Sequence, residues 1–185
     1  ICACLVGSEM CIRDSDNLVA WKEDFNMGSL DAVPAQTDAA SYLMRAAWRF
    51  EGRMRVGGHS KGGNLAVYAA VHNPEELQER IIEVYNNDGP GFRESVRDLP
   101  EYQRIAERIH TLVPQYSLVG VLLSHDGDFE IVESNETGIS AHNGYTWEVL
   151  GTRFVRCEDF SFRTRVFNDA VHGSAAGILP QARRA

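Results

Sequence analysis

The chain has 185 residues, of which 44% are hydrophobic and 24% are charged. This balance fits one soluble globular domain and excludes an intrinsically disordered chain. No run approaches the 18 apolar residues that a transmembrane helix needs, so membrane association is not indicated. The net charge is −8 and Lys and Arg do not cluster, which argues against nucleic acid and anionic membrane surfaces as partners.

The first fifteen residues differ in character from the rest. They read ICACLVGSEMCIRDS and show no sustained helical or strand period. Three of the four Cys lie here: Cys2, Cys4 and Cys11. Their spacing, with no matching Cys or His pair, does not fit a zinc site. Residues 5–15 resemble the translation of a sequencing adapter, so we interpret residues 1–15 as non-native and expect them to pack poorly.

Cys157 is then the one native cysteine. A single Cys gives no intrachain disulfide framework, so a reducing compartment, the cytoplasm, is the default expectation.

The remaining chain alternates between helix and strand patterns. In its first half it predicts a helix from Pro34 that ends at Gly52, a strand over 53–58, a helix over 64–72 and a strand over 81–85. Charged helices are expected over 93–109, followed by strands over 111–114 and 129–133 and a polar loop over 134–145. The last elements are two strands or one bent hairpin over 147–157 and an amphipathic helix over 160–172. Such alternation is typical of an α/β fold with a largely parallel sheet.

One motif carries chemistry. Gly58-His59-Ser60-Lys61-Gly62 matches G-x-S-x-G between a predicted strand and a predicted helix. This is the pattern of a nucleophile elbow, a sharp turn that exposes the Ser hydroxyl. Its small residues avoid clashes with neighbouring backbone, and the amide of Lys61 is the expected oxyanion donor. The order of residues fits neither a P-loop nor a dinucleotide fingerprint.

The stretch GGHSKGGNLAVYAA resembles the elbow of lipase-like α/β-hydrolases, whose common form has Leu where this chain has Lys61. With WKEDFNM, PAQ, NNDGPGF and VPQYSLVG in order, the chain resembles an uncharacterised bacterial family of lipase-like hydrolase domains over roughly residues 16–175. The resemblance implies an α/β-hydrolase fold and a Ser-acid-His arrangement. The chain is short for that fold, so we expect residues 16–185 to be a partial domain whose N-terminal strands are missing.

The catalytic base should follow Ser60 in the chain, because this fold orders its triad as Ser, acid, His. His142 lies in a late polar loop and is the preferred base. His125 is the alternative. His110 and His172 fit ordinary structural roles.

The orienting acid is less well defined. Asp88 follows the strand over 81–85 at a dense turn, which is the sheet edge where such sites gather. Asp also caps turns of this kind, so a purely structural role is the competing interpretation. Asp126 and Asp128 are the alternatives. The region where lipases carry the acid, LVPQYSLVG, has no carboxylate.

These residues predict a lipase- or esterase-like serine hydrolase that cleaves an ester or thioester through an acyl-enzyme on Ser60. The expected partner is a small-molecule or lipid acyl ester. A non-catalytic binding domain of the same fold and an acyltransferase with the same triad are the alternatives. No cofactor is expected, and no set of ligands at metal spacing predicts a metal site.

Overall fold

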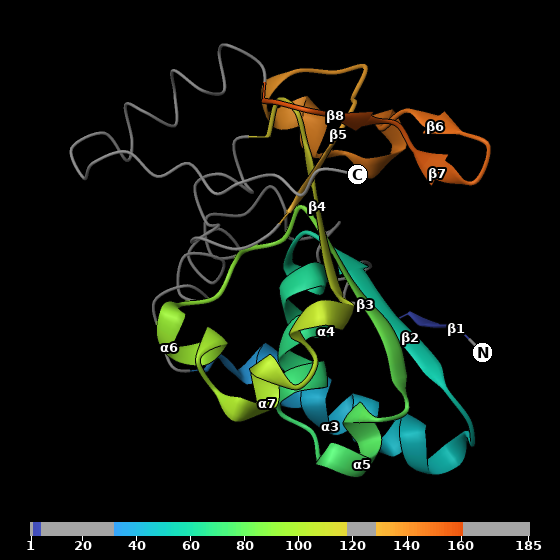
Figure 1. The fold of residues 1–185 in the computed structure, drawn as a ribbon, viewed down its shortest axis with the longest axis vertical. Coiled ribbons are helices and arrows are strands. Elements are labelled where there is room, and N and C mark those ends of the chain that lie inside the picture. The colour runs from blue at the N-terminus through green and yellow to red at the C-terminus, as the bar shows by residue number, and fades with distance from the viewer. Residues whose placement is uncertain (1, 5–31, 118–128, 161–185) are drawn as a thin grey trace.

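A six-stranded sheet organises the chain, as seen in a computed structural model that describes residues 2–4, 32–117 and 129–160 (Figure 1). Its strand order is β1-β2-β3-β4-β5-β8. The strands are β1 (Cys2–Cys4), β2 (Met54–His59), β3 (Ile81–Asn87), β4 (Ile109–Pro114), β5 (Glu130–Val132) and β8 (Arg156–Cys157). The first five run parallel, and β8 pairs antiparallel with β5. The chain therefore has a mixed α/β fold with a mostly parallel sheet and flanking helices.

In the described residues, helices lie in the connections from β1 to β2, from β2 to β3 and from β3 to β4. They are α3 (Pro34–Arg49), α4 (Lys61–Val71), α5 (Glu75–Gln78), α6 (Glu94–Arg97) and α7 (Pro100–Gln103), followed by the 3₁₀ turn η1 (Ala106–Arg108). The first of them begins with Pro34, whose fixed φ suits the first helical turn. The Gln36 side chain then accepts the backbone N–H of Val33 at 2.9 Å, which satisfies one N-terminal donor.

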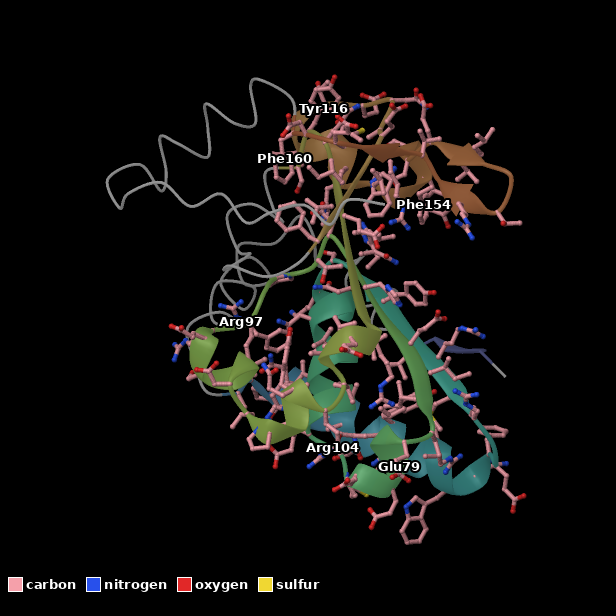
Figure 2. All side chains as sticks on the ribbon, in the orientation of Figure 1. Glu79, Arg97, Arg104, Tyr116, Phe154 and Phe160 are labelled. Atoms are coloured by element: carbon pink, nitrogen blue, oxygen red, sulfur yellow. The ribbon has the colours of Figure 1, made fainter. Side chains whose placement is uncertain are left out.

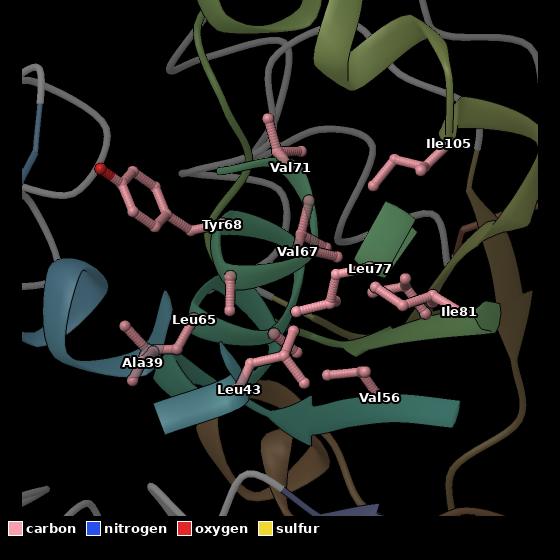
Figure 3. Packing of buried hydrophobic residues seen from close by; sticks show 14 of the residues in the cluster. Ala39, Leu43, Val56, Leu65, Val67, Tyr68, Val71, Leu77, Ile81 and Ile105 are labelled. Atoms are coloured by element: carbon pink, nitrogen blue, oxygen red, sulfur yellow. The ribbon is translucent and has the colours of Figure 1, made fainter. Parts of the chain in front are cut away.

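The main core lies between the sheet and the helices α3 and α4 (Figure 3). Val56 of β2 and Val84 of β3 are register partners, so their side chains share one sheet face, and both are almost fully buried. Leu43 of α3 and Val67 of α4 belong to the same buried cluster. Burial of this apolar layer fixes α4 against β2 and β3, and thereby the turn that joins β2 to α4.

A second region forms beyond β4. It contains the 3₁₀ turns η2 (Gly138–His142) and η3 (Gly144–Thr146) and the hairpin of β6 (Val149–Leu150) with β7 (Arg153–Phe154). Successive residues of β5 face opposite sides of the sheet: Ile131 belongs to a cluster with Phe160, and Val132 belongs to one with Trp147 and Phe154. Phe160 and Phe154 accordingly lie on either side of β5 (Figure 2).

The structure refines several predicted elements. Helix α4 begins at Lys61, three residues earlier than predicted, and β3 continues to Asn87. The segment 147–157 forms the β6–β7 hairpin and then β8, which returns to the main sheet. The helix predicted over 160–172 lies outside the described residues, apart from Phe160.

The N-terminal segment also differs from expectation. Cys2–Cys4 pairs in parallel with β2 as an edge strand, although the sequence predicts poor packing there. Residues 5–15 lie outside the described part of the chain. Among the described helices, none is long and apolar enough to cross a membrane.

The close approach of α4 to β2 depends on Gly58. A Cβ at this position would lie 2.2 Å from the carbonyl oxygen of Gly62 and 2.8 Å from the amide nitrogen of Gly63. We expect Gly58→Ala to lower the free energy of unfolding by about 1–3 kcal/mol, because backbone must shift to admit the methyl group. Urea denaturation followed by circular dichroism measures the change.

Gly62→Ala is the matched control in the same turn. A Cβ there meets no atom of the described residues within 4 Å, and the position is helical, so Ala should be neutral or stabilising by up to about 1 kcal/mol. Equal losses in the two variants would contradict the steric explanation.

Candidate active site

Ser60 forms the turn between β2 and α4 in a backbone conformation that side chains rarely adopt. Its φ is 57° and its ψ is −133°. Its amide donates to the carbonyl of Asn87 at 2.8 Å, and its carbonyl accepts the amide of Gly63 at 2.8 Å. Such a conformation costs about 1–3 kcal/mol and occurs chiefly at functional sites. The turn has the strand-to-helix geometry of a nucleophile elbow.

Asp88 follows β3 directly and is completely buried. It too has a positive φ, 52°, which Asp tolerates better than most residues. Its amide donates to the carbonyl of Leu112 on β4 at 2.7 Å, so the residue is tied to the next strand. A fully buried carboxylate requires hydrogen-bond donors, and both of its oxygens have one.

The first donor is His142. Its Nδ1 lies 2.6 Å from Asp88 Oδ2, and its side chain is 21% exposed. An ionised carboxylate can only accept, so Nδ1 carries the proton of this bond. In the neutral imidazole, Nε2 is then the unprotonated nitrogen and can accept a proton from a hydroxyl.

The second donor is Ser117. This fully buried residue donates its Oγ hydrogen to Asp88 Oδ1 at 2.7 Å, across 29 residues of sequence. The sequence analysis missed it, since Ser117 opens an apolar stretch with no recognisable motif. The sequence holds no signal that identifies it, because the need of a buried carboxylate for donors does not say which residue supplies them.

His59, the residue before Ser60, touches the segment that carries His142. Its Nε2 lies 2.6 Å from the backbone carbonyl of His142, and the two rings are 4.6 Å apart between centroids. The Nε1–H of Trp147 donates to the neighbouring carbonyl of Ala141 at 2.9 Å. Burial, and then the nearby His142, lower the pKa of His59 below the usual 6.5.

The structure thus brings together Asp88 and His142, and it joins the Ser60 turn to them through His59. Lys61 is the first residue of α4. The backbone amides of the first helical turn do not donate to carbonyls of the same helix. His125, Asp126 and Asp128 lie outside the described residues. His110 stacks on Tyr85, with ring centroids 5.1 Å apart.

Within the described residues, no group of three or more His, Cys, Asp or Glu side chains is arranged to hold a metal ion. The thiol of Cys157 is half-buried, and burial raises its pKa to about 11, which disfavours a reactive thiolate.

Comparison with known proteins identifies the family. A family model described as Mbeg1-like matches residues 10–185, so the chain belongs to the Mbeg1-like family. That description names neither a lipase nor an α/β-hydrolase, so the resemblance to a lipase-like α/β-hydrolase family was wrong. The match begins at residue 10 and does not cover residues 1–9, so the interpretation of residues 1–15 as adapter-derived stays a prediction. No curated protein matches the chain.

The strain at Ser60 has a measurable consequence. Glycine adopts a positive φ at no steric cost, so we expect Ser60→Gly to raise the free energy of unfolding by about 1 kcal/mol. Ser41→Gly on the exposed side of α3 is the control, and it should lower stability by about 0.5–1 kcal/mol as glycine does in a helix. Urea titrations of both variants test this, and a loss of stability in Ser60→Gly would show that the turn is unstrained.

The lowered pKa of His59 predicts a pH dependence. The unfolded chain binds a proton near pH 6.5 while the folded protein resists it, so stability is full well above pH 6.5 and falls as pH drops toward the lower folded pKa. His59→Gln lacks this group. We therefore expect wild type to lose stability relative to His59→Gln between pH 7.5 and 5, measured by urea unfolding, and a constant difference would contradict the burial effect.

Proposed function

We propose that this member of the Mbeg1-like family is an esterase-like serine hydrolase that cleaves an ester or thioester through an acyl-enzyme on Ser60. One observation carries the proposal: the 2.6 Å bond between Asp88 Oδ2 and His142 Nδ1, tied through His59 to the strained turn at Ser60. A buried carboxylate that orients an imidazole beside a serine turn is the arrangement that activates a hydroxyl nucleophile.

The chemistry follows from these groups. Ser60 Oγ attacks the acyl carbon while His142 Nε2 takes the hydroxyl proton. Asp88 keeps Nδ1 protonated and stabilises the imidazolium that forms. The same proton passes to the leaving alcohol or thiol as its bond to the acyl carbon breaks. Water then attacks the acyl-enzyme with His142 as base, and Ser60 recovers its proton when the acid leaves.

Charge develops on the substrate oxygen in both steps. The proposed donor is the backbone N–H of Lys61, the residue after the nucleophile and the first of the eleven residues of α4. The helix N-terminus adds a partial positive charge at this point, which favours an oxyanion.

The finer fold assignment is part of this proposal. An α/β-hydrolase arrangement is supported by the parallel order of β2, β3, β4 and β5, by the turn between β2 and α4, and by the chain order Ser60, Asp88, His142. It rests on this geometry alone.

The proposed substrate is a small-molecule or lipid acyl ester. Two apolar side chains within three residues of His142 in the chain are exposed, Ile139 on η2 and Tyr145 on η3. Exposed apolar surface beside a catalytic group suits an acyl chain better than a charged polymer such as nucleic acid.

A fluorophosphonate probe tests the nucleophile. We expect the full chain to react covalently with the probe and Ser60→Ala not to react, since the bond forms on Ser60 Oγ. Ser41→Ala is the matched control and should label like wild type. A wild-type protein that stays unlabelled, or labelling that survives in Ser60→Ala, would favour a non-catalytic binding domain.

Asp88→Asn tests the acid in an assay of ester hydrolysis. Asn tolerates the positive φ of this position, but its side chain favours the wrong imidazole tautomer, so hydrolysis of p-nitrophenyl acetate should fall by roughly 10⁴-fold. Product analysis in the presence of an alcohol distinguishes hydrolysis, which releases acetate, from an acyltransferase, which forms the new ester.

A further inference from the structure

The segment that carries the proposed base is held by two aromatic N–H groups. Trp147 Nε1–H donates to the carbonyl of Ala141 at 2.9 Å, and His59 Nε2 lies 2.6 Å from the carbonyl of the next residue, His142. Trp147 is only six residues away from its acceptor and holds the turn locally. His59 is on β2, 83 residues away, and directly precedes Ser60.

The direction of the His59 bond is fixed by its partner. A carbonyl oxygen only accepts, so Nε2 of His59 must carry the hydrogen. Burial and the neighbouring His142 lower the pKa of His59, which keeps the ring neutral. A neutral donor fits this position, because a positive charge on His59 would disfavour a positive charge on His142. The centroids of the two rings are 4.6 Å apart.

The bond joins the two reacting residues by a short path. On one side His59 is covalently attached to Ser60, whose turn is anchored by its amide on the carbonyl of Asn87. On the other side it holds the backbone of His142, while Asp88 holds the ring of the same residue. His142 is therefore fixed at two points, and one of them moves with the nucleophile.

We propose that His59 is a positioning residue, whose Nε2–H bond to the His142 carbonyl sets the separation of the nucleophile Ser60 from the base His142. The inference rests on the proposed hydrolase function. It assigns His59 no contact with substrate. Its effect is on the alignment of a proton transfer, for which a displacement of about 1 Å costs up to about 100-fold in rate.

Two variants of similar size separate the donor from the shape of the side chain. His59→Gln places an amide N–H near the position of Nε2, whereas His59→Met fills similar space without a donor. We expect His59→Met to lower kcat for p-nitrophenyl acetate, and the rate of fluorophosphonate labelling of Ser60, by about 10- to 100-fold with little change in KM. His59→Gln should recover most of this loss.

Gly144→Ala is the control. Its added methyl would lie 3.7 Å from Cδ2 of His59, an ordinary contact that touches the same ring and leaves the bond in place. It should keep the wild-type rate. Thermal unfolding of each variant confirms that it is folded.

The outcomes are distinct. If wild type does not label at Ser60, the proposed hydrolase function fails and the positioning role fails with it. If wild type labels and His59→Met labels equally fast, the function stands and the positioning role is overturned. Equal slowing in His59→Met and His59→Gln also overturns it, because the donor would then not matter.

A measurement on the unmodified protein covers the case in which His59→Met does not fold. Long-range ¹H–¹⁵N NMR should show His59 neutral at pH 7.5, with its proton on Nε2 and protected from exchange with water. A proton on Nδ1 would mean that the bond to the His142 carbonyl does not exist.

Discussion

The hydrogen bond between Asp88 Oδ2 and His142 Nδ1 joins residues 54 positions apart and determines how the rest of the site is built. A completely buried carboxylate is costly unless its oxygens are satisfied by donors. His142 supplies one donor, Ser117 supplies the other, and the amide of Asp88 is tied to Leu112 on the neighbouring strand. With these partners the Asp88 carboxylate is held in one orientation, in which it aligns the imidazole of His142.

The turn at Ser60 depends on the same strand end. The register pairs His59 with Asn87, and the Ser60 amide donates to the Asn87 carbonyl. The end of β3 therefore holds the turn of the proposed nucleophile and is followed directly by the proposed acid, Asp88. The free-energy cost of the strained backbone at Ser60 is offset by apolar burial in the core. The buried layer of α3, α4, β2 and β3 is apolar and lies beneath the turn, and it holds α4 in the place that the strained backbone requires.

Local features of this architecture could be predicted from the sequence, whereas contacts between distant segments could not. The glycines around Ser60 and the strand–helix alternation are short-range signals, and they predicted the parallel α/β sheet and the turn. The sequence also singled out Asp88 and His142 as candidates. Ser117 was missed and His59 was given no role, because their partners lie 29 and 83 residues away and no periodic pattern encodes such bonds. The sequence also did not predict that residues 147–157 divide between two sheets, because strands of two residues are too short to show an alternating pattern.

The three proposed catalytic residues differ in how firmly the sheet itself places them. Ser60 and Asp88 directly follow adjacent parallel strands, whose carboxyl ends meet at one sheet edge about 4.8 Å apart, so the pairing of β2 with β3 already sets their spacing. His142 has no such support, because it ends a 3₁₀ turn outside the sheet. Side-chain hydrogen bonds must therefore fix the position of His142, as strand pairing fixes Ser60 and Asp88. This explains why Trp147, His59 and Asp88 all form hydrogen bonds to residues 141 and 142.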